Sequence, residues 1–137
     1  DAHKGYMGKV AVTQEEIDAM KPSLDNLSYT SYMVRVAYDE SEVEVLAAVL
    51  SCAYSYEVIA KKIVANRPES VDDPFYGDWI RGYASDEYAA GNVMLIETLD
   101  RLSAHYTEEQ LRHLEDIIIA CSRYEMAIWQ MAWEMRQ

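Results

Sequence analysis

Residues 41–68 read SEVEVLAAVLSCAYSYEVIAKKIVANRP, and this stretch decides the fold. Ser41 and Glu44 form a capping box, the pattern that starts a helix, and Asn66-Arg67-Pro68 is a pattern that ends one. Between these two signals large apolar residues recur every three or four positions, which places them on one side of a long helix. The members of this first stripe are Val45, Val49, Cys52, Tyr56, Ile59 and Ile63.

Start and stop patterns divide the rest of the chain into further helices. Capping boxes at Thr13–Glu16 and Thr107–Gln110 predict a short helix that ends near Lys21-Pro22 and a last helix that reaches nearly to Gln137. Three more helices are predicted from Asp25 or Asn26 to about Tyr38, after Asp72-Asp73-Pro74, and from Ser85 or Asp86 to about Ser103. Strand alternation is lacking. The sequence therefore predicts an all-α helix bundle.

Length and charge limit the domain count and the partners. The 137 residues suit one domain, and 12 basic against 24 acidic side chains give a formal net charge of −12. Such a surface repels phosphate backbones and anionic lipids, which excludes nucleic acid and membranes as main partners. No uninterrupted apolar run approaches the roughly 18 residues of a membrane span, and no secretory signal is visible. With only two cysteines, far apart in sequence, we expect a soluble cytoplasmic protein.

The last predicted helix carries a second stripe, whose fifth member is a carboxylate. Its members are Leu111, Leu114, Ile118, Cys121, Glu125, Ile128 and Ala132. Burying Glu125 costs hydration worth several kcal/mol, and such residues are retained mostly where chemistry or binding needs them. Alternatively, Glu125 lies at the edge of the stripe and reaches solvent or an arginine of a neighbouring chain. For Cys52 the stripe alone favours a structural role, because free cysteine commonly packs as a small hydrophobe.

Tyrosine is unusually frequent, with 11 Tyr and three Trp against one Phe. A buried tyrosine needs a partner for its hydroxyl, so several of them beside apolar stripes suggest an aromatic pocket with a polar rim. The candidates are Tyr29, Tyr56, Tyr83 and Tyr124. Such a pocket suits a flat heteroaromatic ligand, although each tyrosine taken singly is also compatible with ordinary packing.

Metal and nucleotide sites lack the residues they require. Di-iron bundles use Glu-x-x-His pairs on facing helices, and His3, His105 and His113 do not complete one. No glycine-rich loop follows a strand, so backbone amides have no cradle in which to hold phosphates.

Four segments stand out along the chain: SYTSY at 28–32, LSCAYSYE at 50–57, YGDWIRGYAS at 76–85 and SRYEMAIWQMAW at 122–133. In order and spacing they resemble the signature segments of the TenA/thiaminase II family. The resemblance begins near His3 and covers essentially the whole chain. It implies a heme-oxygenase-like all-α fold, with residues 1–137 as a single, partial domain. The family has additional N-terminal helices, one bearing an Asp that binds the pyrimidine edge, and this chain starts after them.

The resemblance also implies an activity. Family members hydrolyse the C–N bond at the pyrimidine methylene of thiamin or aminomethylpyrimidine and release hydroxymethylpyrimidine, without a metal or cofactor. Cys52 stands at the position of the family's nucleophile, and Glu125 stands at the position of the carboxylate that acts as its catalytic acid and base. Tyr29, Tyr56 and Tyr83 match pocket tyrosines, whereas Ile128 stands where the family usually has Phe. The alternative is a pyrimidine-binding protein without catalysis, because the Asp is missing.

Chemistry supports this assignment. An electron-poor pyrimidine that Glu125 protonates on a ring nitrogen accepts the Cys52 thiolate, and the resulting adduct expels the leaving group. We expect tyrosine hydroxyls to lower the pKa of Cys52. Without the N-terminal helices, the aromatic faces would form a larger exposed patch than a monomer tolerates. We therefore expect a separate N-terminal segment or a homo-oligomer, which the resemblance suggests is a tetramer.

Overall fold

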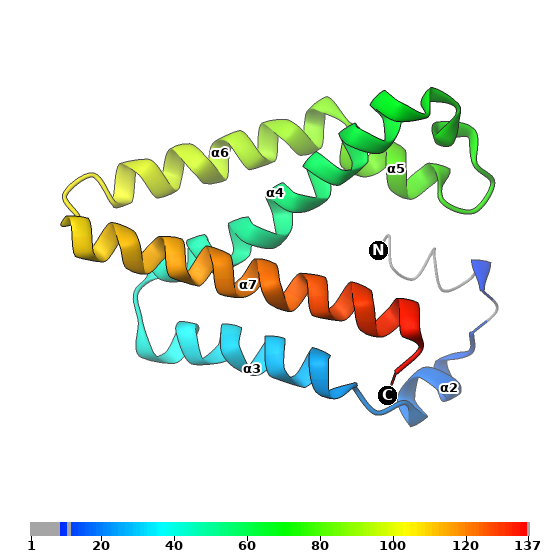
Figure 1. Ribbon diagram of the computed structural model, residues 1–137, viewed down its shortest axis with the longest axis horizontal. Helices are drawn as coiled ribbons and strands as arrows, with labels where there is room; N and C mark the ends of the chain where they lie inside the picture. Colours follow the sequence, from blue (N-terminus) through cyan, green and yellow to red (C-terminus); the bar gives the residue numbers. More distant parts are fainter. Residues whose placement is uncertain (1–8, 11, 137) are drawn as a thin grey trace.

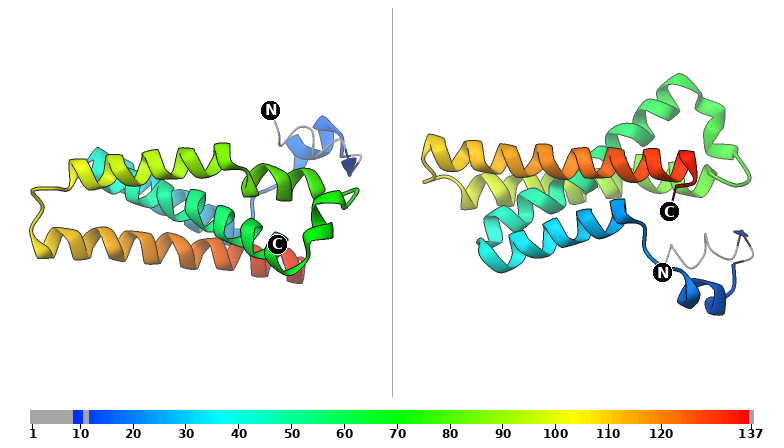
Figure 2. Two further views of the ribbon diagram at one scale, coloured as in Figure 1. Left: turned by 90° about the horizontal axis from the view of Figure 1, so that it is seen from above. Right: turned by 60° about the horizontal axis from the view of Figure 1, so that its bottom comes forward.

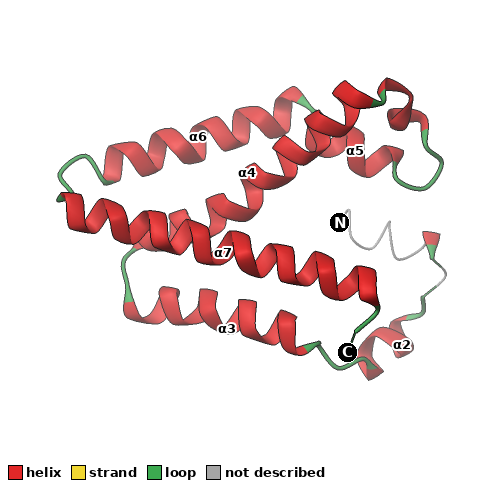
Figure 3. Cartoon of the chain, viewed as in Figure 1, coloured by secondary structure: helices red, strands yellow, loops and turns green. Residues whose placement is uncertain are grey.

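The computed structural model describes residues 9, 10 and 12–136, and these residues form helices joined by loops, without a strand (Figure 3). The elements in order are α2 (Gln14–Ala19), α3 (Leu24–Asp39), α4 (Glu42–Asn66), the 3₁₀ helix η1 (Pro68–Asp72), α5 (Gly77–Ala84), α6 (Asp86–Leu102) and α7 (Glu108–Glu134) (Figure 1). The predicted all-α fold is confirmed. His3 lies outside the described residues.

Capping side chains start the helices. The three predicted capping boxes, at the N-caps Thr13, Ser41 and Thr107, are all formed. The predicted start of α3 was one to two residues late, because Ser23 is the N-cap and its hydroxyl accepts a bond from the Asn26 amide at 3.2 Å. The predicted start of α5 was early, because the Asp73 carboxylate accepts from the amides of residues 75 and 76 and holds a turn before Gly77.

Helix α4 is the centre of the bundle and contacts α3, α5, α6, α7 and η1. Figure 1 shows α6 and α3 on opposite sides of α7, and in both views of Figure 2 α4 crosses the bundle obliquely. The core lies where α3, α4 and α7 meet. Its buried residues are Tyr29, Val36, Val43, Ala47, Ala48, Leu114, Ile117 and Cys121.

The most buried face of α4 is not the predicted stripe of large residues. Val49 and Ile59 are each 39% exposed, whereas Ala47, Ala48 and Ala60 are at most 1% exposed. Small side chains let the neighbouring helices approach closely, so they decide which face of a central helix is packed. The α7 stripe is confirmed in its middle, at Leu114, Cys121 and Glu125, and becomes exposed towards its ends.

Helix α4 is also long and apolar enough, by length and composition, to cross a membrane. The core helix of a bundle meets the same criterion, and α4 is packed against four other α-helices. Its position in the fold accounts for its composition.

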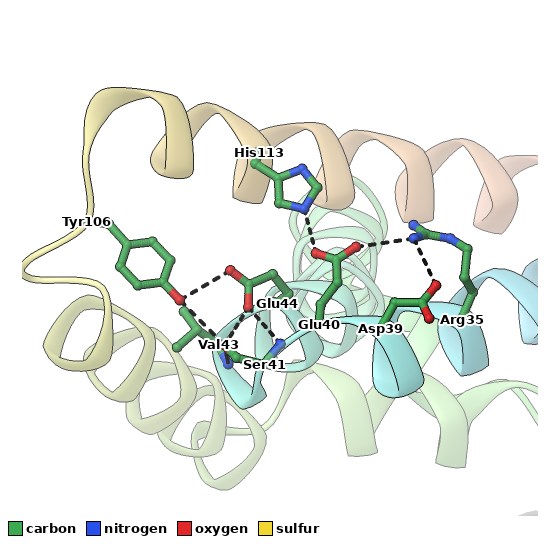
Figure 4. A network of polar contacts seen from close by, with 8 residues as sticks. All are labelled: Arg35, Asp39, Glu40, Ser41, Val43, Glu44, Tyr106 and His113. Atoms are coloured by element: carbon green, nitrogen blue, oxygen red, sulfur yellow. Dashed lines mark hydrogen bonds and ion pairs between the residues drawn. The ribbon is translucent and has the colours of Figure 1, made fainter.

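A polar network ties the α3–α4 connection to the start of α7 (Figure 4). Glu40 lies between Arg35 Nη1 at 3.2 Å and His113 Nε2 at 2.5 Å. Glu44 accepts bonds from the Ser41 amide at 3.1 Å and the Tyr106 hydroxyl at 3.2 Å. Burial of Glu44 opposes its ionisation, but the hydrogen bonds outweigh burial and lower its pKa.

We expect Glu44→Gln to destabilise the fold by about 1–3 kcal/mol near neutral pH, because the hydrogen bonds donated by Ser41 and Tyr106 lose a charged acceptor. The folded-state pKa is lowered, so this contribution is present above the unfolded value of about 4.3 and disappears as pH falls through the folded value. Urea unfolding between pH 3 and 7 measures the effect. Glu42→Gln, at an exposed position in the same turn, is the control. An equal cost for both variants at pH 7 would contradict the role of the network.

Candidate active site

Helices α4 and α7 bring the two predicted catalytic residues together. The Tyr56 hydroxyl of α4 donates to Glu125 Oε2 of α7 at 3.3 Å, and the Cys52 thiol, one turn before Tyr56, interacts with the same carboxylate. Glu125 is only 8% exposed. The alternative in which Glu125 reaches solvent at the edge of the stripe is therefore wrong for this fold.

The thiol of Cys52 is neutral in this environment. Burial is the largest cause, and interaction with the Glu125 carboxylate adds to it, so that the pKa rises to about 12. Our expectation that tyrosine hydroxyls lower this pKa was wrong, because a carboxylate beside a half-buried thiol disfavours a second negative charge. The same carboxylate is placed to accept the thiol proton.

The second cysteine belongs to the core. Cys121 lies one turn before Glu125 and is fully buried. Burial, with a contribution from Glu125, raises its pKa to about 11. A buried thiol of this kind is inert.

Tyr29 approaches Glu125 from α3. Its side chain is 6% exposed, and its hydroxyl interacts with the Glu125 carboxylate but makes no hydrogen bond of ordinary length among the described residues. Burial and the charge of Glu125 raise its pKa, so the hydroxyl keeps its proton. A buried hydroxyl that makes no bond costs free energy, and its donor is available to a ligand atom. The ring stacks on Tyr124, with centroids 5.6 Å apart.

Aromatic rings surround Tyr56. Tyr83 of α5 packs against it at 5.0 Å between centroids, Trp79 at 5.8 Å and Trp129 of α7 at 6.0 Å. We call Tyr56, Trp79, Tyr83 and Trp129 the aromatic cluster. The two tryptophans were not predicted as site residues, although Trp129 lies four positions after Glu125, on the same side of a helix. Ile128 packs against the core cluster that contains Tyr29.

Two serines, which the sequence analysis missed, join α4 to α7 beside the site. Ser51 and Ser122 lie 2.8 Å apart between hydroxyl oxygens, next in sequence to Cys52 and Cys121. Because Ser122 donates to the Ile118 carbonyl at 2.8 Å, Ser51 is the donor between the two hydroxyls. Periodicity could not identify this contact, since both serines look like ordinary polar interruptions.

The histidines of the described residues lie away from the candidate active site. His113 pairs with Glu40 at the far end of α7, and His105 is exposed. In the part of the chain that the structure describes, no group of three or more His, Cys, Asp or Glu side chains is arranged to hold a metal ion.

This arrangement defines an all-α bundle of the heme-oxygenase-like kind, with a thiol, a carboxylate and stacked tyrosines at one place in its core. Residues 1–135 match the TENA/THI-4/PQQC family, and the chain belongs to that family.

Characterised relatives and solved structures are similar to this chain over nearly its whole length. Over 132 residues, the chain is 39% identical to the aminopyrimidine aminohydrolase of Helicobacter pylori, and the matched region makes up 96% of this chain and 60% of that protein. Over 136 residues, it is 38% identical to the aminopyrimidine aminohydrolase of Halalkalibacterium halodurans, and the matched region makes up 99% of this chain and 60% of that protein. The solved structure of the TenA homologue from P. horikoshii superposes with a TM-score of 0.78 at 27% identity, over 95% of this chain and 59% of that one. The chain thus spans about 60% of the length of the two enzymes.

Proposed function

We propose that this chain carries the reacting groups of an aminopyrimidine aminohydrolase. The substrate is a pyrimidine with a leaving group on its exocyclic methylene, either thiamin or aminomethylpyrimidine, and the product is hydroxymethylpyrimidine. The observation that carries the proposal is the hydrogen bond from Tyr56 to the buried carboxylate of Glu125, together with the electrostatic interaction of the Cys52 thiol with that same carboxylate. The similarity to two aminopyrimidine aminohydrolases, at 38–39% identity, supports it.

Glu125 moves the proton in this mechanism. It takes the proton of the Cys52 thiol and delivers it to a ring nitrogen as sulfur adds to a ring carbon. The electron pair of the dearomatised ring then expels the leaving group from the methylene, as the neutral ring of thiamin or as ammonia from the protonated amine of aminomethylpyrimidine. The oxygen of water adds to the methylene and one proton of that water goes to solvent. The C–S bond then breaks with its electron pair on sulfur, which restores the aromatic ring, and Glu125 returns the proton of the ring nitrogen to the thiolate. The net change is addition of water across the C–N bond.

The tyrosines hold these groups and the substrate. Tyr56 donates to Glu125 and fixes its orientation, while Tyr83 packs on the ring of Tyr56. The unpartnered hydroxyl of Tyr29 serves as a donor to the pyrimidine. Ile128 supplies an aliphatic wall. We propose that this chemistry needs no metal or cofactor.

The second candidate is a pyrimidine-binding protein without turnover. A thiol whose pKa is about 12 favours it, because the nucleophile is almost entirely protonated near neutral pH. Calorimetric titration with each pyrimidine, run beside chromatographic detection of hydroxymethylpyrimidine, separates the two functions. Product formation supports the hydrolase, whereas saturable binding without product supports the binding protein.

We further propose a cytoplasmic homo-oligomer. The outer face of α3 carries an exposed apolar stripe at Leu24, Leu27, Val34 and Tyr38, with exposed fractions from 44% to 86%. Their spacing puts all four on one side of the helix, the pattern of a surface that a second chain covers. Light scattering of Val34→Glu should report a smaller particle than the parent chain, and Glu97→Gln, on α6, should not change it. An unchanged mass for Val34→Glu would place the contact elsewhere.

A further inference from the structure

A buried amide joins α6 to α4. Asn92 is the one buried residue of α6, a helix that the structure describes in full, and it is only 3% exposed. Its Nδ2 atom donates to Glu57 Oε2 at 2.6 Å and to the Ala53 carbonyl oxygen at 3.3 Å, both on α4. These bonds use both hydrogens of the amide nitrogen. Because a buried amide is costly unless it is paired, the two bonds fix α6 against one turn of α4.

A second side chain of α6 reaches the same carbonyl. The Tyr88 hydroxyl donates to the Ala53 oxygen at 3.1 Å. A carbonyl inside a helix ordinarily accepts only the amide four residues later, so two further donors on one oxygen serve more than helix formation. Ala53 directly follows Cys52, whose own carbonyl accepts a bond from the Ser55 hydroxyl at 2.9 Å. The backbone that carries the thiol is therefore held by side chains at two successive carbonyls.

Glu57 strengthens this contact because it is charged. Its side chain lies at the buried junction of α4 and α6, 9% exposed, and Lys61 Nζ donates to its Oε1 atom at 2.6 Å. The bonds from Asn92 and Lys61 lower the pKa of Glu57, so the carboxylate is ionised near neutral pH. A hydrogen bond to an ionised acceptor is stronger than one to a neutral acceptor. The amide of Asn92 is thus held firmly in the orientation that also serves the Ala53 carbonyl.

Tyr88 also borders the side of the site that holds the carboxylate. Its ring packs edge-on against Tyr83, with centroids 4.9 Å apart, and Tyr83 packs against Tyr56 at 5.0 Å. The Tyr56 hydroxyl in turn donates to Glu125. One residue of α6 therefore contacts both the backbone next to the nucleophile and the rings that orient its proton acceptor.

We propose that Tyr88 and Asn92 are positioning residues that hold the Cys52 turn of α4 in place opposite Glu125. This inference rests on the proposed function, because it assigns the groups that hold the nucleophile of that reaction. Both residues act through the Ala53 carbonyl and touch no reacting atom. A shift of this turn would move the thiol relative to α7, and a misplacement of about 1 Å can cost about a hundredfold in rate.

Two substitutions test the role. Asn92→Leu keeps nearly the same size and removes both bonds of the amide, whereas Tyr88→Phe removes one hydroxyl and keeps the ring on Tyr83. In the complete protein that contains this chain, kcat for release of hydroxymethylpyrimidine should fall about tenfold or more in Asn92→Leu and about threefold or more in Tyr88→Phe. KM should stay within about twofold, because Tyr29 and Tyr83 are unchanged.

The matched control removes a tyrosine hydroxyl from the other end of α4. Tyr106 donates to Glu44 at 3.2 Å, and Tyr106→Phe should lower the thermal midpoint without lowering kcat. Asn92→Gln restores an amide, and its extra methylene has room in the hollow of about 550 Å³ that Asn92 lines, so this variant should recover most of the kcat lost in Asn92→Leu. Parental kcat in both Asn92→Leu and Tyr88→Phe, or an equal loss in Tyr106→Phe, would overturn the proposal.

Hydrogen exchange separates failure of this inference from failure of the proposed function. Without substrate, amides 53–57 should exchange faster in Asn92→Leu than in the parent, because α6 no longer holds that turn. Faster exchange with parental kcat in an active protein would overturn the positioning role and leave the hydrolase standing. A parent that releases no hydroxymethylpyrimidine would overturn the proposed function, and the positioning role with it, whatever the exchange rates.

Discussion

Cys52→Ser is expected to lower kcat/KM for hydrolysis of thiamin and aminomethylpyrimidine by about a thousandfold or more, because a serine hydroxyl is a far weaker nucleophile towards the protonated ring. The side chain changes by one atom at a half-buried position, so the fold should persist. Steady-state release of hydroxymethylpyrimidine from the complete protein that contains this chain measures the loss. Circular dichroism of the same preparation checks that the helices remain.

The matched control for this substitution is the other thiol. Cys121→Ala alters a fully buried core position that touches no substrate, so it should cost stability while turnover of the folded fraction stays within a few-fold of the parent. Turnover in Cys52→Ser close to the parental value would remove the thiol from the mechanism. A large loss in the Cys121 variant with the thermal midpoint unchanged would show that the wrong sulfur was assigned.

Glu125→Gln should also abolish turnover, by about a hundredfold or more, because no group then carries the proton between thiol and ring. The same substitution should make the thiol more acidic. The negative carboxylate is one cause of the raised pKa of Cys52, so its replacement by a neutral amide lowers that pKa, while burial still keeps it above the ordinary value. Loss of catalysis would thus accompany easier ionisation of the nucleophile.

The rate of Cys52 alkylation by iodoacetamide as a function of pH reads this shift directly. In Glu125→Gln the rate should begin to rise at lower pH than in the parent. Both the parent and the Glu125→Gln variant carry Cys121→Ala in this experiment, so that Cys52 is the thiol whose alkylation is measured. Glu134→Gln, an exposed acid on the same helix, should leave the profile unchanged. An alkylation profile identical to that of the parent would mean that the carboxylate does not act on the thiol.

Local patterns predicted the helices well. Each capping box needs only a side chain and a backbone amide three residues apart, so Thr13, Ser41 and Thr107 could be read without tertiary information. The starts of α3 and α5 were less certain because several Ser, Asp and Asn residues compete there as caps. Ser23 caps α3 and Asp73 holds a turn before α5 through bonds as local as those of the capping boxes, so spacing alone did not rank the candidates.

The sequence predicted which residues form the candidate site, but it did not predict how their environment shifts the pKa of Cys52. Cys52, Tyr56 and Glu125 stood out on helical stripes, and the family segments strengthened that selection. Trp79 and Trp129 were missed because an aromatic residue at helical spacing looks like ordinary packing. The raised pKa of Cys52 was also missed, since a charge on α7 acts on a thiol of α4 only after the two helices pack.

By itself, the sequence determined the helix starts that are marked by capping boxes, the all-helical character of the chain, and which side chains can carry acid, base and nucleophile chemistry, because these properties depend on neighbours within about one helical turn. Only the tertiary structure decided that the small-residue face of α4 is the packed one and that burial, with the Glu125 carboxylate adding to it, raises the pKa of the Cys52 thiol. Burial and electrostatic interaction depend on distances between residues far apart in the chain, and packing sets those distances.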